Sequence, residues 1–245
     1  MNTIQSHSLA VLIELDKFCK EYKVEYCLAW GTLLGAVRHN GFIPWDDDID
    51  IAMDEENWEK FKRLAKNNKL PSHLRFEDSY TNPSCAVPKV RDLRFLDVVD
   101  SNGEMGYFVD IFPFRRYSEY EKRIIKLCCL GSTLRKYRKK IKNPVFRGCY
   151  TILMLVPHEL SSLCKKIVFP MLEKKSLEAT GPYLDKFLFL TPKEWFKYDD
   201  FYPYVNKEFE GYMFPVPHNW DAILKARYGD YMTPEDYNRT HYRGK

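Results

Sequence analysis

Four carboxylates fall within five residues at positions 46–50, and this acidic run is the part of the sequence best suited to chemistry. Side chains of an extended chain alternate between two faces, so Asp48 and Asp50 share one face while Ile49 and Ile51 point into the core. Two carboxylates this close repel each other unless a positive charge lies between them. A hard divalent cation with oxygen ligands would supply that charge. The run therefore predicts a metal site that assists phosphate chemistry.

A calcium-binding loop of the EF-hand type is the competing interpretation of the same run. Such a loop needs a glycine at its sixth position, and the sixth residue counted from Asp46 is Ile51. The spacing of its oxygen ligands is also missing. We expect Asp46 and Asp47 to shape the loop, to cap it or to hold a water molecule near the ion.

A third acid, Asp110, lies inside the apolar segment 107–112. A carboxylate in such a strand is costly unless it is paired or bound to a metal. Two interpretations stay open. Backbone amides could satisfy Asp110, or it could lie opposite Asp48 and Asp50 and complete a magnesium site. In the second case it could also accept the proton of an attacking hydroxyl group.

Gly31 and Thr32 follow a short apolar segment at 26–30 and could bind a phosphate group. A glycine at a strand-to-helix turn lets the backbone approach a phosphate, and the amides and hydroxyl that follow can donate hydrogen bonds to it. The alternative is a turn that binds no ligand.

Apolar periodicity indicates the elements that must position these residues. Residues 6–22 have the amphipathic pattern of a helix, and 26–30 has the pattern of a short buried strand. Residues 33–38 could add one or two helical turns before the acidic strand. Asp54 can cap a further helix that extends to about residue 67.

The next part of the chain is expected to be extended. Segments 74–79 and 85–100 have strand character, and Asn102–Gly103 predicts a hairpin that joins the second of them to 106–113. From residue 118 to residue 180 the pattern becomes helical, basic and apolar.

These patterns predict an α/β (α+β) protein in three parts. Residues 1–115 would form the core, 116–180 a basic helical insert, and 181–245 a C-terminal segment that packs back on the core. The C-terminal segment should contain a helix at 219–228 that ends at Gly229.

The chain of 245 residues has a net charge of +4, and this charge is unevenly distributed. Residues 115–175 contain about 16 basic and about 4 acidic side chains, which leaves an acidic excess elsewhere. The asymmetry favours an anionic partner for one region, although a solvated helical surface has the same composition. The mixed basic, aromatic and apolar residues of 120–170 could contact an anionic membrane surface. No recognition motif for nucleic acid accompanies them, so we expect no nucleic-acid partner.

Seven cysteines are scattered without a CxxC pair, which favours reduced and mostly buried thiols. The N-terminus lacks the basic start and apolar run of a signal peptide. No apolar stretch approaches the ~20 residues that a membrane span needs. We expect a cytoplasmic location, with peripheral contact at the inner face of the cytoplasmic membrane as a further expectation.

Residues 26–53, YCLAWGTLLGAVRHNGFIPWDDDIDIAM, resemble the signature of the LicD family, which includes fukutin and fukutin-related protein. The segments GYFVDIFPF and FEGYMFPVPHNWDAILKARYGDYM are also similar to that family, so the likeness spans most of the chain. The resemblance implies a polymerase-β-type nucleotidyltransferase core with a mixed sheet. It also implies a Gly-Thr loop at Gly31–Thr32 and metal carboxylates at Asp48, Asp50 and Asp110.

The activity implied by this resemblance is transfer of phosphocholine, or of phospho-ribitol in the fukutin branch, from a CDP-activated donor to a glycan, with release of CMP. One or two Mg²⁺ ions, or Mn²⁺ in their place, would be held by the three aspartates. The chain lacks the membrane anchor of the fukutins and resembles the bacterial branch, which favours CDP-choline as donor. The acceptor would be a teichoic acid, a lipopolysaccharide or a capsule, and a lipid-linked precursor would fit as well.

Two further groups of residues could bind such a donor. Arg38, Lys89 and Arg91 lie near the core strands, where they could bind phosphate or simply be surface residues. Choline donates no hydrogen bond, so proteins hold it against aromatic faces. Trp30 and Trp45 flank the acidic run and could form that cage, with Tyr107 as a weaker candidate; core packing is the alternative for each.

Other functions fit parts of the pattern. A donor carrying ribitol or glycerol phosphate would need polar groups instead of an aromatic cage. A nucleotide-sugar glycosyltransferase with a DxD site usually places a full nucleotide-binding unit before that motif, and only 47 residues precede Asp48. An enzyme that transfers the nucleotide itself would release pyrophosphate rather than CMP. A CDP-choline-binding module without activity is the non-enzymatic alternative, although the intact set of acids argues against it.

Overall fold

The computed structural model describes residues 1–78, 81–82, 85, 87–95, 98–100, 103–123, 142–144, 183–186, 196–233 and 242–243. Most of the predicted basic helical insert, at 124–141 and 145–180, lies outside the described residues. The chain divides into two compact units: Met1–Phe114, Lys186–Leu188 and Asp199–Lys245 form the first, and Arg115–Asp185 and Phe189–Tyr198 form the second. The functional division into core, insert and returning segment stays a prediction.

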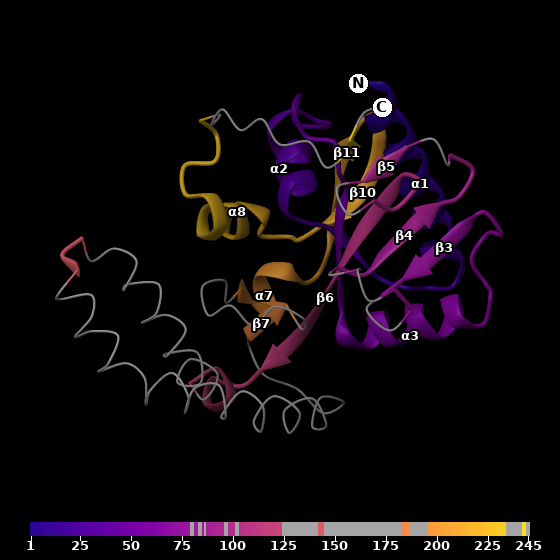
Figure 1. The fold of residues 1–245 in the computed structure, drawn as a ribbon. Helices are drawn as coiled ribbons and strands as arrows, with labels where there is room; N and C mark the ends of the chain where they lie inside the picture. Colours follow the sequence, from indigo (N-terminus) through magenta and orange to yellow (C-terminus); the bar gives the residue numbers. More distant parts are fainter. Residues whose placement is uncertain are drawn as a thin grey trace. The chain divides into compact units, whose positions relative to one another are not determined.

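A mixed sheet lies at the centre of the first unit (Figure 1). Five of its strands pair in the order β1-β2-β6-β4-β3. The β2–β6 pair is parallel and the other three pairs are antiparallel. The strands are β1 (Cys27–Leu28), β2 (Asp50–Asp54), β3 (Leu74–Glu77), β4 (Lys89–Asp92) and β6 (Phe108–Tyr117). This arrangement confirms the predicted α/β (α+β) fold class.

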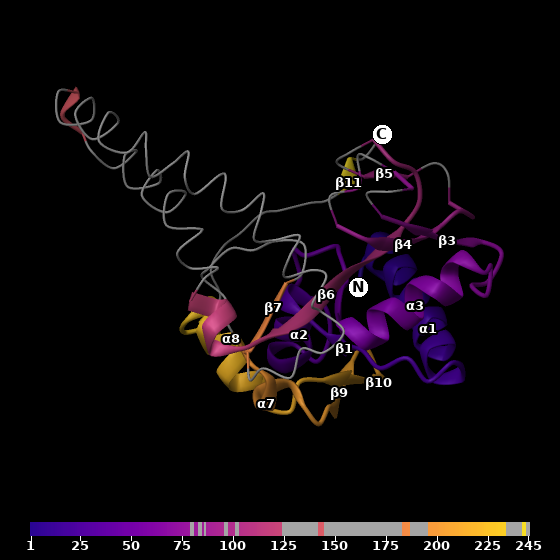
Figure 2. The ribbon, with the colours of Figure 1, turned by 90° about the horizontal axis from the view of Figure 1, so that it is seen from below.

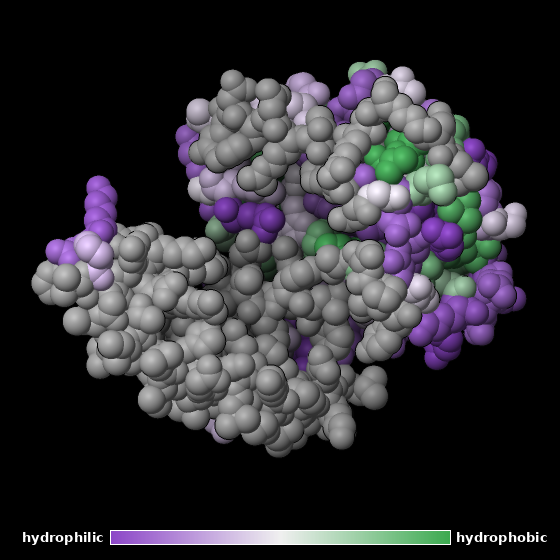
Figure 3. Space-filling model, in the orientation of Figure 1, coloured by the Kyte–Doolittle hydropathy of each residue, from purple (hydrophilic) through white to green (hydrophobic). Residues whose placement is uncertain are grey.

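Helices α1 (Thr3–Glu21) and α3 (Glu55–Lys66) lie on the same face of this sheet (Figure 2). Asn2 and Gln5 form a capping box at the start of α1, and the Asp54 side chain accepts a hydrogen bond from the Asn57 amide at the start of α3. The apolar side of α3 is buried through Trp58 and Phe61, and its outer side is hydrophilic (Figure 3, lower right). Both helices predicted from apolar periodicity are confirmed.

The C-terminal segment returns to the first unit. Strands β9 (Val205–Phe209) and β10 (Tyr212–Val216) form a hairpin whose strands contact α2 (Trp30–Arg38) and β1, respectively. Helix α8 (Trp220–Tyr228) contacts α2 as well. The α8 helix has the predicted stop, because Gly229 follows it with a φ of 69°, a conformation that favours glycine.

The predicted hairpin around Asn102–Gly103 is confirmed, because the Gly103 amide donates to the Asp100 carbonyl at 3.1 Å and the Asp100 amide donates to the Glu104 carbonyl at 2.8 Å. Strands β4 and β6 pair antiparallel, and this hairpin lies in the excursion between them. Within it β5 (Val99–Asp100) pairs with β11 (Tyr242–Arg243), and Val99 bridges Met105. Gly106 lies on the returning segment, with a φ of 96°, and a Cβ atom there would lie 2.2 Å from the carbonyl oxygen of Asp92. A buried arginine, described below, occupies the interior of this excursion.

The remaining elements are short. Strands β7 (Tyr183–Lys186) and β8 (Phe196–Lys197) pair antiparallel, and α7 (Tyr198–Phe201) follows. In the second unit the Arg116 guanidinium lies 3.7 Å from the centre of the Tyr198 ring. Among the helices in the described part of the chain, none is both long enough and apolar enough to cross a bilayer.

Candidate active site

Three aspartates converge at one end of the β2–β6 pair. Asp50 and Asp110 lie directly opposite each other in the parallel register, and Asp48 precedes Asp50 by two residues. One carboxylate oxygen from each of the three lies within 4.8 Å of the other two. The predicted convergence of Asp48, Asp50 and Asp110 is therefore observed.

The local backbone explains why these aspartates meet. Ile49 and Ile51 are completely buried and anchor the acidic strand in the core, as their alternation with the aspartates predicts. The Asp110 amide donates to the Ile49 carbonyl at 2.8 Å, and the Ala29 amide donates to the Asp50 carbonyl at 2.9 Å. These backbone hydrogen bonds fix the acidic strand between β6 and the start of α2.

Thr32 supports the acidic strand. Its hydroxyl oxygen accepts a hydrogen bond from the Asp50 amide at 2.8 Å, and the side chain is buried. This bond gives Thr32 a positioning role, and the hydroxyl keeps its own proton to donate. Phosphate binding by Thr32 stays a prediction.

Gly31 lines the pocket beside the acids, and its lack of a side chain leaves room for the Asp46 carboxylate. A Cβ atom at position 31 would lie 2.6 Å from Oδ2 of Asp46. The glycine therefore lets the Asp46 carboxylate approach the first turn of α2, where partial positive charge favours an anion. Gln5 holds the same loop from α1, because its side-chain amide donates to the Asp46 carbonyl at 2.8 Å.

The electrostatics of the three aspartates fit a cation. Burial, together with the negative charges of Asp48, Asp110 and Asp46, raises the pKa of the Asp50 carboxyl well above its usual value, and Arg227 opposes this effect. All the donors are carboxylate oxygens, which are the ligands that Mg²⁺ prefers, and they lie within 4.8 Å of one another. The donor set therefore fits Mg²⁺, and Mn²⁺ accepts the same ligands.

Lys89 lies beside the triad. It pairs with Asp110 across the β4–β6 ladder, and its Nζ atom is 2.9 Å from Oδ1 of Asp110. Nζ also lies 3.8 Å from the centre of the Phe108 ring, and the residue is buried. The structure thus gives Lys89 a carboxylate partner, and it offsets one of the three negative charges.

Arg91 does not reach the site. Its side chain is only 1% exposed and forms ion pairs with Glu77 and Asp100, at 3.3 and 2.9 Å. It also donates to the Gly106 carbonyl at 3.0 Å, inside the excursion between β4 and β6. The predicted phosphate-binding role of Arg91 is therefore corrected: the guanidinium is a buried structural group.

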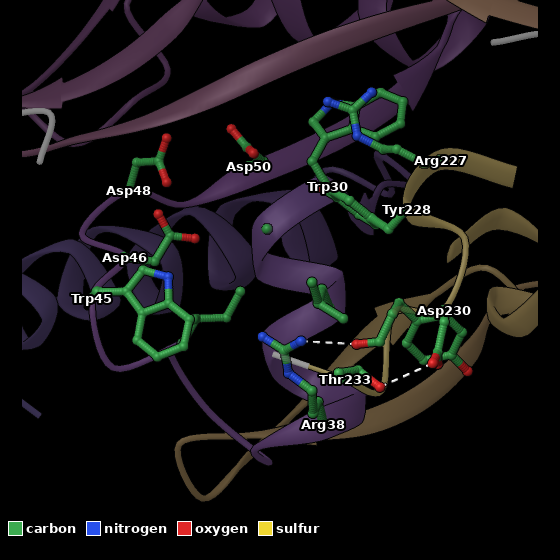
Figure 4. A pocket seen from close by; sticks show the side chains of 14 residues that line it. Trp30, Arg38, Trp45, Asp46, Asp48, Asp50, Arg227, Tyr228, Asp230 and Thr233 are labelled. Carbon is green, nitrogen blue, oxygen red and sulfur yellow. Dashed lines mark hydrogen bonds between the residues drawn. The ribbon is translucent and has the colours of Figure 1, made fainter. Parts of the chain in front are cut away.

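A pocket of about 540 Å³ opens beside Asp48 and Asp50 (Figure 4). Its lining includes Gly31, Arg38 and Trp45 from the predicted set. Asp46, Asp48 and Asp50 lie together on one side of the close-up, whereas Arg38 lies at the other end. There its guanidinium donates to the Tyr231 carbonyl at 2.8 Å and to the His39 ring at 2.9 Å.

Trp30 also lines the pocket, but its ring is engaged by the protein itself. The Arg227 guanidinium lies 4.0 Å from the ring centre, and the Phe112 and Phe114 rings are each 5.8 Å away. The prediction that Trp30 forms part of a choline cage is therefore corrected, because its ring contacts the guanidinium of Arg227. Tyr107 stacks on His7 at 4.6 Å and does not line the pocket, so Trp45 is the predicted cage residue that keeps its place.

Comparison with known proteins agrees with this geometry. The family model described as the LicD/FKTN/FKRP nucleotidyltransferase domain matches residues 23–147. The lipopolysaccharide cholinephosphotransferase LicD of Haemophilus influenzae is 30% identical over an alignment of 267 residues, which covers 98% of this chain and 96% of that protein. An uncharacterized protein of Rickettsia typhi is 49% identical over 173 residues, 66% of this chain and 55% of its own length.

The chain belongs to the LicD family. The recognition of the family from its motifs is thereby confirmed, and the chain is a member of a transferase family. The matched nucleotidyltransferase domain contains all three aspartates and the Gly31–Thr32 turn. In this LicD-family chain Asp50 and Asp110 lie on the β2–β6 pair, and Asp48 lies two residues before Asp50.

Several pocket residues were not identified from the sequence. They come from the C-terminal segment, beyond the part that the LicD model matches, and are Arg227, Tyr228, Asp230, Tyr231 and Thr233. A signal was present, because all but Thr233 lie within the third segment similar to the family. Glu210 was also missed: its carboxylate accepts from the Phe42 amide at 2.9 Å, which ties the β9–β10 hairpin to the loop before the acidic run.

Proposed function

We propose that this protein transfers phosphocholine from CDP-choline to a cell-surface glycan and releases CMP in a magnesium-dependent reaction. The glycan would be a lipopolysaccharide, teichoic acid or capsule component, either free or lipid-linked. The enzyme would act at the cytoplasmic side, and the basic residues of 120–170 would contact the membrane. The reaction class follows from the family, whereas the donor, the metal and the acceptor belong to this proposal.

One observation carries the proposal: Asp48 and Asp50 line a pocket that also contains the guanidinium of Arg227, and an oxygen of Asp110 lies within 4.8 Å of theirs. The diphosphate of a CDP ester carries negative charge, and three aspartates alone would repel it. A bound Mg²⁺ would neutralise the phosphate oxygens and polarise the phosphorus for attack. The similarity over almost the full length to a cholinephosphotransferase supports choline as the group transferred.

The residues divide the work of phosphoryl transfer, which depends mainly on positioning and charge. Asp48, Asp50 and Asp110 would hold the ion. Asp110 would also accept the proton of the attacking hydroxyl, and Lys89, whose Nζ lies 2.9 Å from Oδ1 of Asp110, would keep that carboxylate oriented. Trp45 would present an aromatic face to the trimethylammonium group. Arg38 would contact the donor at the other end of the pocket.

Product analysis tests this proposal. The purified protein is incubated with Mg²⁺ and CDP-choline, CDP-ribitol or CDP-glycerol, and nucleotide products are separated. CMP release from CDP-choline, above that from the two alditol donors, is expected. A preference for CDP-ribitol or CDP-glycerol would assign the alditol alternative, and pyrophosphate release would assign nucleotide transfer. CDP-choline binding that needs no metal and gives no product would indicate a binding module.

The membrane contact has its own measurement. Vesicles that contain anionic lipid are mixed with the protein at low salt and pelleted. Co-sedimentation that falls as salt is added is expected for a basic surface segment. Protein that remains in the supernatant at low salt would remove the membrane from the proposal.

A further inference from the structure

Arg227 and Trp30 form a unit that neither the motif analysis nor the family match assigns. Trp30 begins α2, beside the acidic strand, and Arg227 lies in the last turn of α8. The guanidinium carbon is 4.0 Å from the centre of the indole ring, which is the distance of a cation–π contact. Figure 4 shows Arg227 lying across Trp30 on the side of the pocket next to Asp50.

The Trp30 side of this unit is built rigidly. Its φ is 44°, in the left-handed region that bulky residues rarely adopt. Backbone strain of this kind persists where the surrounding structure fixes it, and such positions are enriched at functional sites. The Phe112 ring meets the indole edge-on, and the Phe114 ring is tilted against it, so the ring is wedged between aromatic side chains and the guanidinium. The platform therefore has little freedom to turn away from Arg227.

Arg227 also acts electrostatically on the acids. Its positive charge opposes the rise in the pKa of Asp50 that burial and the other carboxylates cause, so the guanidinium lies close enough to influence that side chain. Both Arg227 and Asp50 line the same pocket. A guanidinium held against a ring face keeps a planar edge of N–H groups, and that edge is suited to bidentate binding of phosphate.

The other basic side chains predicted for phosphate binding are placed differently. Lys89 lies against Asp110, and Arg91 is enclosed by Glu77 and Asp100. Arg38 donates to the Tyr231 carbonyl at the other end of the pocket. Within the described part of the chain, Arg227 is thus the guanidinium that lines the pocket next to the aspartates.

We propose that Arg227 binds the nucleotide phosphate that leaves as CMP, with Trp30 as the positioning residue that holds its guanidinium flat. This inference rests on the proposed function. In that reaction a glycan hydroxyl oxygen forms a bond to the phosphorus that carries choline. The bond from that phosphorus to the oxygen bridging to the CMP phosphate breaks, and its electron pair leaves on CMP. The hydroxyl proton passes to Asp110 or to solvent, and Arg227 compensates the charge that develops on CMP.

Equilibrium binding to the full-length protein tests the assignment, with CMP and cytidine as probes in the presence of Mg²⁺. Arg227→Gln is expected to weaken CMP binding about 10- to 100-fold, because a charge-assisted hydrogen bond is lost, and to leave cytidine binding unchanged. Arg227→Lys keeps the charge without the planar fork and should retain part of the affinity. Lys225→Gln is the matched control, since Lys225 lies on the same helix, pairs with Asp221 and does not line the pocket.

Trp30 is tested by conservative rescue. Trp30→Leu removes the aromatic platform and should reduce CMP affinity toward that of Arg227→Gln. Trp30→Phe keeps a ring face and should restore most of it. A residue that only filled space would give similar CMP affinities in the two variants once circular dichroism shows that both are folded.

The outcomes separate this inference from the proposed function. If the wild-type protein releases CMP from CDP-choline and Arg227→Gln binds CMP as tightly as wild type, the inference fails and the function stands. If the wild-type protein binds CMP but does not cleave CDP-choline, and Arg227→Gln loses CMP binding, the function fails and the inference stands as a nucleotide-phosphate site. Equal losses of CMP and cytidine affinity, or wild-type protein that binds no CMP, would overturn the inference.

Discussion

Two clusters of charged side chains lie on the same mixed sheet, and they differ in how their charge is balanced. Around Arg91, two carboxylates, Glu77 and Asp100, are matched by two guanidinium groups, because Arg75 also pairs with Glu77. Around Asp50, the carboxylates of Asp48, Asp110 and Asp46 outnumber the two nearby positive charges, which are Lys89 on Asp110 and Arg227. The first cluster is enclosed, and the second adjoins a pocket.

The comparison separates structural charge from functional charge. A buried ion pair whose hydrogen bonds are satisfied holds the fold together, and breaking it leaves a charge stranded in the interior. Carboxylates with too little positive charge nearby repel one another, and the fold holds them together against that repulsion. A bound cation lowers the repulsion. The same type of substitution should therefore have opposite consequences in the two clusters.

The largest expected effect is on catalysis. Asp50→Asn, or Asp48→Asn, should lower CMP release from CDP-choline by about 10³-fold or more, because several kcal/mol of charge stabilisation at the reacting phosphate is lost. The free energy of unfolding should stay at or above the wild-type value, since one repelling charge is removed. Turnover is measured in a magnesium titration and stability by urea denaturation. Full activity at saturating Mg²⁺ would contradict a metal role.

The second-largest expected effect is on stability, for the matched Asp-to-Asn substitution in the cluster around Arg91. Asp100→Asn should lower the free energy of unfolding by about 3 kcal/mol, because Arg91 loses a buried anionic partner. Asp100 lies outside the pocket, so the folded fraction should keep its affinity for CMP. Urea denaturation compares this variant with Asp50→Asn. Equal changes in the free energy of unfolding of the two variants would contradict the proposed difference between the clusters.

Magnesium itself should stabilise the unbalanced cluster. At a free concentration 100 times its Kd, an ion that binds only the folded state adds about 2.7 kcal/mol to the free energy of unfolding. Calorimetric scans with Mg²⁺ and with EDTA should show this increase for wild type and Asp100→Asn. They should not show it for Asp50→Asn. An equal increase in all three proteins would place the ion elsewhere.

A smaller effect is expected where the fold supports the acids. Thr32→Val keeps the shape but leaves the Asp50 amide without its hydroxyl acceptor, which should lower the free energy of unfolding by about 1–2 kcal/mol. The apparent affinity for Mg²⁺ should fall as well, because the acidic strand is held less firmly. Thr81→Val is the control, since Thr81 forms a comparable local hydrogen bond with Asp78 outside the site. A loss of Mg²⁺ affinity in both variants would assign the effect to general loosening.

Much of the site was predictable because its signal is local. Alternation along an extended chain placed Asp48 and Asp50 on one face and their isoleucine neighbours in the core. Asp110 was marked by the cost of a carboxylate in an apolar strand, but the sequence left two interpretations open, and the parallel β2–β6 register decided between them. Helix α1 followed from apolar periodicity, and α3 followed from periodicity and from Asp54 at its start.

The roles of the basic residues were not predictable in the same way. Lys89 and Arg91 are two residues apart and share one face of β4, so local sequence treats them alike. The pairing of strands separates them: Lys89 lies opposite Asp110, whereas Arg91 lies opposite Phe108 on β6 and Arg75 on β3. Register across a sheet depends on contacts between distant segments, and the sequence of a single strand does not specify which residues will pair with it.

By itself, the sequence determined that this LicD-family chain would fold as an α/β protein and place Asp48 and Asp50 on one face, because alternation and helical periodicity act over a few residues. Only the tertiary structure brought Asp110 opposite Asp50 and decided which cations lie near the three acids. Arg227 comes from a helix near the end of the chain, and it reaches Trp30 because the C-terminal segment returns to α2. A contact between segments so far apart depends on how the whole chain packs, and no local pattern specifies it.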